Sequence, residues 1–73
     1  KINPDLKRRV LIKLEWMDAA KSLNDLRSPP SNRLHPLTGD YEGYWTISVS
    51  GAWRLVFRFQ EGHCYEVSLV QYH

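Results

Sequence analysis

The stretch from residue 44 to residue 70, "YWTISVSGAWRLVFRFQEGHCYEVSLV", alternates apolar and polar residues in three runs. The runs cover residues 44–49, 52–59 and 64–70, and the sequences "SG" and "QEGH" between them are typical of tight turns. Because strand side chains point to opposite faces in turn, the pattern predicts a three-stranded antiparallel meander with one apolar face. The residues expected on that face are Trp45, Ile47, Val49, Trp53, Leu55, Phe57, Phe59, Tyr65, Val67 and Leu69.

An apolar sheet face has to be covered, and the segment before it offers one amphipathic helix. Residues 3–26 carry helix-start signals in Asn3, Pro4 and Asp5, and the two prolines of "RSPPSN" prevent the helix from continuing. The sequence therefore predicts an α+β fold in which this helix packs on one face of a small antiparallel sheet, as a single domain over residues 1–73. The helical residues expected to pack against the strands are Leu6, Val10, Leu14 and Met17.

Length and composition limit the remaining possibilities. A chain of 73 residues suffices for one small domain of marginal stability. Its single cysteine, Cys64, cannot form an internal disulfide. No apolar run approaches the roughly 20 residues that span a bilayer, and the opening "KINPDLKRR" is too polar for a signal peptide. The net charge of +2 is too small to indicate nucleic-acid binding by itself.

The opposite sheet face carries the residues that could do chemistry. Arg54 and Arg58 lie in the middle strand, and continued alternation places Tyr72 on the same face. The loop over residues 31–43 brings His35. Arginine fits phosphate, histidine exchanges a proton near neutral pH, and tyrosine can stack on a base, so the set suits metal-free cleavage of RNA. Each residue also has a structural interpretation, as a solvated strand face, a loop-packing histidine or a frayed tail.

Two motifs carry a family resemblance. The stretch "NRLHPLTGDYEGYWTISVSGAWRLVFRF" at 32–59 and the terminal "YH" at 72–73 resemble, in order and spacing, the HigB branch of the RelE superfamily. The members of this family are toxins of bacterial type II toxin–antitoxin systems. The resemblance implies that the catalytic positions are His35, Arg54, Tyr72 and His73. The residues expected to bind RNA around them are Arg33, Thr38, Tyr44, Arg58 and Gln71.

The same resemblance implies an activity and partners. The expected activity is ribosome-dependent cleavage of mRNA in the A site, without a metal or other cofactor, in the bacterial cytoplasm and with no membrane partner. The expected partners are the ribosome, its mRNA and a HigA-like helix-turn-helix antitoxin, with operator DNA contacted only through the toxin–antitoxin complex. His73 would also carry the terminal carboxylate, which favours its imidazolium form and suits a general acid.

The sequence departs from the family pattern in three places. Thr38 stands where the family has a lysine, and Gln71 stands where it has an aspartate. The strand and helix with which family members usually open do not precede Asn3 in this sequence, so either the full protein has a longer start or this is a shortened relative. These departures keep a second interpretation open, a non-catalytic toxin homologue that still binds an antitoxin or the ribosome.

Overall fold

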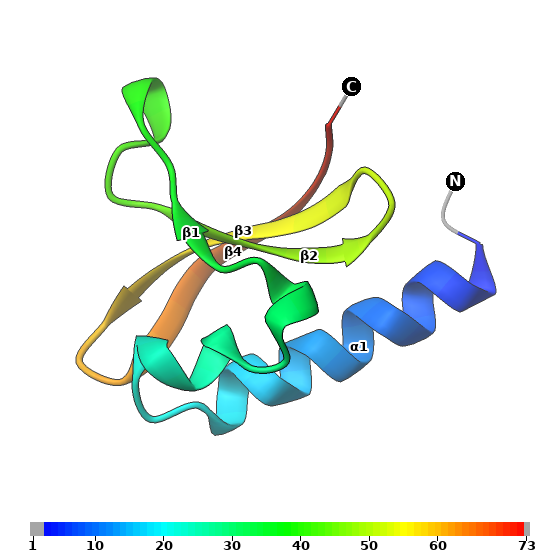
Figure 1. Ribbon diagram of the computed structural model, residues 1–73, viewed down its shortest axis with the longest axis horizontal. Helices are drawn as coiled ribbons and strands as arrows, with labels where there is room; N and C mark the ends of the chain where they lie inside the picture. Colours follow the sequence, from blue (N-terminus) through cyan, green and yellow to red (C-terminus); the bar gives the residue numbers. More distant parts are fainter. Residues whose placement is uncertain (1–2, 73) are drawn as a thin grey trace.

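The computed structural model describes residues 3–72 and has one helix packed against a four-stranded sheet (Figure 1). The strands follow the order β1-β2-β3-β4, and every neighbouring pair is antiparallel. The expected α+β fold is confirmed, with the short β1 as an addition to the predicted meander. Within the described residues, no helix has the length and apolar character to cross a membrane. The elements are α1 (Pro4–Ala19), η1 (Leu23–Arg27), η2 (Pro30–Asn32), β1 (His35–Pro36), η3 (Gly39–Tyr41), β2 (Trp45–Ser50), β3 (Trp53–Gln60) and β4 (His63–Gln71).

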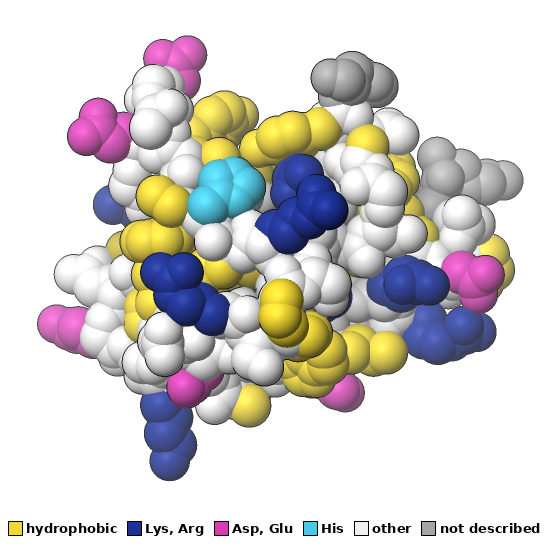
Figure 2. All heavy atoms as spheres, viewed as in Figure 1, with side chains coloured by type: hydrophobic (Ala, Val, Ile, Leu, Met, Phe, Trp, Pro, Cys, Tyr) yellow, Lys and Arg dark blue, Asp and Glu magenta, His cyan; other side chains and the backbone are white. Residues whose placement is uncertain are grey.

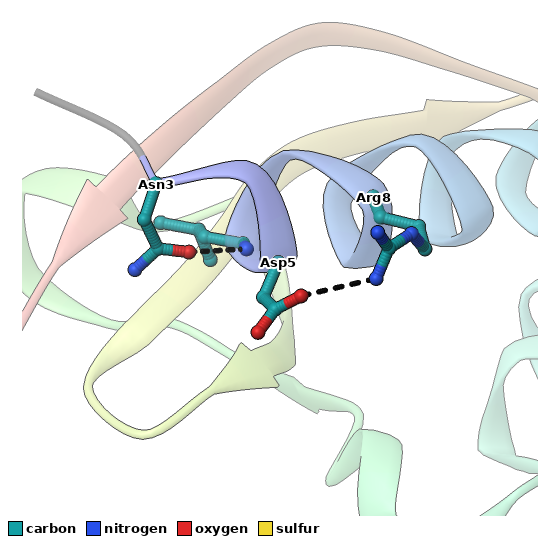
Figure 3. Close-up of polar contacts among 4 residues, drawn as sticks. Asn3, Asp5 and Arg8 are labelled. Carbon is teal, nitrogen blue, oxygen red and sulfur yellow. Dashed lines mark hydrogen bonds and ion pairs between the residues drawn. The ribbon is translucent and has the colours of Figure 1, made fainter.

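Helix α1 begins where its capping residues predict. The side chain of Asn3 accepts a hydrogen bond of 2.8 Å from the backbone N–H of Leu6, and Pro4 occupies the first helical position (Figure 3). Asp5 pairs with Arg8 at 3.0 Å, but both side chains are exposed, so this pair adds little stability. The start of α1 is therefore determined locally by Asn3 and Pro4.

The helix ends earlier than predicted, at Ala19 instead of residue 26. The carboxylate of Asp25 accepts hydrogen bonds from the backbone N–H groups of Lys21 and Ser22, at 2.9 and 3.2 Å. These bonds lower the pKa of Asp25 and stabilise a separate turn, η1, that begins after Ser22. The change of direction lets Leu26, which is only 1% exposed, enter the core.

The core lies between α1, η1 and one face of the sheet. Its most buried members are Leu26, Ile47, Leu55 and Phe57, and Leu6 and Met17 join them from α1. The half-buried packing residues include Val10, Leu14, Trp45, Trp53, Phe59 and Leu69. The predicted contact between the helical stripe and the apolar strand face is confirmed for these residues.

Strand β4 corrects part of the predicted pattern. The register slips by one residue between Val56 and Arg58, near Glu66, whose φ is +52°. Beyond this bulge, Tyr65 pairs with Arg58 and so lies on the face opposite α1, whereas Cys64 pairs with Phe59 and packs on the core. Burial raises the pKa of the Cys64 thiol, whose Sγ lies 3.7 Å from the carbonyl of Met17.

Val67, which was expected in the core, is 39% exposed on β4. β4 is an edge strand of the sheet, and Val67 follows Glu66 at the bulge, so its side chain only borders a small hollow beside Leu14 and Met17. The prediction that Val67 packs in the core is therefore wrong.

Candidate functional site

The register of the strands places His35, Arg54 and Arg58 in rows across the sheet face opposite α1. Residues paired across antiparallel strands share a face, so Arg54 lies between Ser48 and Val70. His35 pairs with Thr46, which in turn pairs with Val56. Thr46 and Val56 are both buried, and the Thr46 hydroxyl donates to the carbonyl of Leu55 at 3.0 Å. The middle of this face is thus a packed row, and the basic and aromatic residues lie in the rows beside it.

Arg54 and Tyr72 meet as the sequence predicts. The guanidinium carbon of Arg54 lies 4.9 Å from the centre of the Tyr72 ring, and its Nη1 donates to the Ser48 hydroxyl at 2.9 Å. The backbone N–H of Tyr72 donates to the carbonyl of Ala52 at 2.8 Å, which ties the end of β4 to the β2–β3 turn. The Nε of Arg54 is buried and has no hydrogen-bond partner among residues 3–72. Arg54 is therefore held in place by Ser48 and Tyr72.

Arg58 lies in a different environment. Its guanidinium is 5.4 Å from the Tyr44 ring and 5.8 Å from the Tyr65 ring. The hydroxyl of Tyr44 donates to the Glu66 carboxylate at 2.7 Å, and this bond raises the pKa of Tyr44. The Glu66 carboxylate thus lies close to the cluster formed by Arg58, Tyr44 and Tyr65. Alternation along the strand placed Glu66 on this face but Tyr65 on the core face, because the bulge that brings Tyr65 here leaves no local sequence signal.

His35 is exposed on β1, and its ring orientation follows from one hydrogen bond. Its Nδ1 lies 2.8 Å from the carbonyl oxygen of Arg33, which can only accept, so Nδ1 carries the proton. The other ring nitrogen, Nε2, then has a free lone pair whenever the ring is neutral. Arg33 itself adopts a left-handed conformation, with φ of 51°, at the end of η2. The turn at Arg33 therefore fixes which His35 nitrogen could take up a proton.

Thr38 and Gln71 are not gathered at Arg54. Thr38 is exposed at the start of η3, and its side chain makes no capping hydrogen bond. Gln71 pairs with Trp53 and therefore lies on the sheet face that packs against α1, not on the face of Arg54. His73, the predicted general acid, lies outside the described residues.

A shallow hollow of about 340 Å³, called here the Arg54 hollow, lies beside Arg54. Arginine and serine side chains dominate its lining, and it contains no carboxylate, so it is suited to an anion. Figure 2 shows Lys and Arg side chains spread over this view of the molecule, with most Asp and Glu side chains near the outline. Residues 3–72 contain no group of three or more His, Cys, Asp or Glu side chains placed to hold a metal ion. The Arg54 hollow is lined by Ser31, Arg33, Ser48, Val49, Ser50, Gly51 and Arg54.

Two residues that the sequence analysis did not single out hold the loop in position. Asn32 is fully buried, and its side-chain amide donates to the carbonyls of Leu26 and Ser28 at 3.0 and 3.4 Å. Its Oδ1 accepts a hydrogen bond from Lys13 on α1. This network fastens the segment leading to Arg33 and His35 onto the helix. A polar residue after two prolines was the only sequence signal, and it does not distinguish an anchor from a solvated turn.

Comparison with known proteins finds one matching family and several relatives. Residues 1–73 match the family described as "RelE-like toxin of type II toxin-antitoxin system HigB". "Endoribonuclease HigB" of Proteus vulgaris is 38% identical over 65 residues, which are 89% of this chain and 70% of that protein. "Toxin HigB-1" of Vibrio cholerae is 44% identical over 50 residues, which are 68% of this chain and 53% of that protein.

A third relative, an uncharacterized protein of Haemophilus influenzae, is 33% identical over 60 residues, which are 82% of this chain and 59% of that protein. The matched segments thus span between about half and 70% of the relatives' own lengths. The family match covers the loop and strands that carry His35 and Arg54, and it confirms the resemblance read from their motifs. The chain belongs to the HigB-like toxins of type II toxin–antitoxin systems, within the RelE superfamily.

Proposed function

We propose that this protein is an endoribonuclease toxin that cuts mRNA on the ribosome without a metal ion. The observation that carries the proposal is the environment of Arg54, which lies against Tyr72 and beside a hollow lined by basic and hydroxyl groups. A relative named as an endoribonuclease supports the same reaction class. A guanidinium held at the edge of this hollow is suited to a phosphate whose negative charge increases during cleavage.

The proposed reaction uses the chain's own groups. A base removes the proton from the 2′-hydroxyl, the oxygen attacks the adjacent phosphorus, and an acid protonates the departing 5′-oxygen. His35 offers Nε2 as the base or, when protonated, as a donor to the phosphate. Arg54 stabilises the charge on the phosphorane, and Tyr72 stacks on a base or bonds to the sugar-phosphate. His73 is proposed as the acid from the family resemblance.

The decisive experiment measures cleavage of ribosome-bound mRNA by the chain and by its Arg54→Ala variant. Losing one such donor typically costs about 100–1,000-fold in rate, so this variant should be nearly inactive while remaining folded. Arg8→Ala is the matched control, because Arg8 is an exposed arginine near the start of α1. Treating the chain with a chelator before the assay should leave its cleavage of ribosome-bound mRNA unchanged, and cleavage should be absent when the mRNA is free of ribosomes. Full activity of Arg54→Ala would overturn the assignment.

The partner proposed for inhibition is a HigA-like helix-turn-helix antitoxin, through which the toxin would also reach operator DNA. Co-expression with such an antitoxin should relieve growth arrest. Arg54→Ala should still bind the antitoxin, because the substitution leaves the core unchanged. Failure of every HigA-like antitoxin encoded beside the gene to bind the chain would contradict this part of the proposal.

A second function is favoured by two residues. Thr38 and Gln71 stand where the family has a lysine and an aspartate, so a cation and an orienting acid are missing. In this alternative the chain binds an antitoxin or the ribosome but does not cut RNA. Antitoxin binding by a folded chain that leaves ribosome-bound mRNA intact would establish it.

A further inference from the structure

A second hollow adjoins the Arg54 hollow. It is called here the α1 groove, measures about 350 Å³ and lies between the helix and β2. Ser31, Ser48 and Val49 line both hollows, so the two form one continuous depression past η2. In Figure 1, η2 lies in the segment that passes between α1 and the sheet. The α1 groove is lined by Arg9, Ile12, Lys13, Trp16, Ser31, Ser48 and Val49.

The α1 groove combines positive charge with an accessible aromatic ring. Arg9, Lys13 and Trp16 project from one side of α1, because they are spaced three or four residues apart. The ammonium of Lys13 lies 4.7 Å from the centre of the Trp16 ring, which is part of a residue 40% exposed to solvent. No acidic residue lines either hollow. Cations along a groove next to a partly exposed aromatic ring are the usual features of a binding site for single-stranded nucleic acid.

Lys13 is held in one position, whereas lysines on an ordinary solvated helix surface are free to move. Lys13 is half-buried and donates to the side chain of the fully buried Asn32. Burial and, second, the nearby charge of Arg9 lower the pKa of Lys13. Two like charges therefore lie close together without a carboxylate in the groove, and a phosphate placed there would relieve their repulsion.

We propose that the α1 groove binds the single-stranded RNA that flanks the cleavage position, with Trp16 stacking on a base and Arg9 contacting a phosphate. The inference rests on the proposed function, because it takes the Arg54 hollow as the place of the phosphate that is cut. RNA leaving that hollow past Ser48 and Ser31 enters the α1 groove directly. The groove thus extends the substrate contact from the sheet onto the helix.

The test measures binding of uncleavable 2′-O-methyl oligonucleotides at low salt. One oligonucleotide has about three nucleotides and the other about ten. The longer length falls within the usual range of single-strand binding sites. Trp16→Ala should weaken binding of the longer one by about 5- to 150-fold, the equivalent of one stacked base, and leave the shorter one unchanged. Trp16→Phe should restore most of the loss. Arg9→Ala should weaken the longer one and flatten its dependence on salt concentration.

Leu11→Ala is the matched control, because Leu11 is an exposed residue of the same helix and lines neither hollow. Equal binding of both oligonucleotides by Trp16→Ala and the parent would overturn the proposal. Unchanged RNA binding with lost antitoxin binding would overturn it too, and would make the groove a protein-docking surface. If the parent chain cuts no mRNA but shows the Trp16-dependent difference, the groove proposal stands and the nuclease proposal fails.

Discussion

Arg54 and Arg58 lie on the same face of β3 but have different neighbours. Arg54 has a serine, a tyrosine and a buried Nε without a partner in residues 3–72, whereas Arg58 lies between two tyrosines near Glu66. The sequence pattern could place both on the face opposite the helix but could not separate them. Their difference depends on the bulge in β4, which places Tyr65 on the face of Arg58. Of the two, Arg54 lines the Arg54 hollow and Arg58 does not.

This difference predicts unequal effects of removing each arginine. Arg58→Ala should lower the rate of ribosome-bound mRNA cleavage by less than 10-fold, about 1.4 kcal/mol of activation free energy, against about 100–1,000-fold for Arg54→Ala. The physical reason is that the charge of Arg58 already lies close to the Glu66 carboxylate that bonds to Tyr44. Single-turnover cleavage rates of the two variants provide the comparison. A larger loss from Arg58→Ala than from Arg54→Ala would reverse the roles assigned here.

At the scale of elements, the strands were predictable and their irregularities were not. Period-2 alternation determined β2 and β3, and the turn between β3 and β4 has Glu61 and Gly62 with positive φ, as the hairpin sequence indicated. The bulge depends on pairing between distant residues, so alternation within one strand could not reveal it. The early end of α1 depends on Asp25 bonding back to the chain, which competes with helical periodicity.

Phe57 tests the packing of the helix on the sheet. It is fully buried between β2, β4 and α1, so Phe57→Ala should lower the free energy of unfolding by about 3–5 kcal/mol. Urea denaturation followed by circular dichroism measures this change. Val67→Ala is the control, because Val67 is largely outside the core, and it should cost less than about 1 kcal/mol. Similar costs for the two substitutions would mean that the core has been placed wrongly.

At the scale of the whole molecule, the proposed site is assembled from segments far apart in sequence. Arg54 comes from the middle strand, Tyr72 from the end of β4, and His35 from the strand that follows the 3-10 turns. Motif order and spacing could propose these residues for the site, because the family resemblance includes them all. The separation of His35 from Arg54 could not be predicted, because it depends on how β1 pairs with β2. This pairing puts His35 in the row of the buried Thr46 and Val56, whereas Arg54 lies in the next row.

Removing Tyr72 and His73 together tests whether the end of the chain belongs to this site. β4 extends to Gln71, so a chain ending there keeps the pairing of β4 with β3 and should remain folded. It loses the ring that lies 4.9 Å from the Arg54 guanidinium and the hydrogen bond from Tyr72 to Ala52. Loss of general acid catalysis typically costs about 100–10,000-fold, so cleavage should fall at least that far.

The measurement compares ribosome-bound mRNA cleavage by the parent, by the shortened chain and by Tyr72→Phe, with antitoxin binding as a control for folding. Tyr72→Phe keeps a ring that can stack and contact Arg54, so it separates the ring from its hydroxyl. Activity near the parent level in Tyr72→Phe, with none in the shortened chain, assigns the function to the ring and to His73. A shortened chain that cuts as fast as the parent would remove both residues from the site. The non-catalytic interpretation would be favoured only if the parent chain itself cut no mRNA. In that case no cleavage reaction would remain in which Arg54 could act.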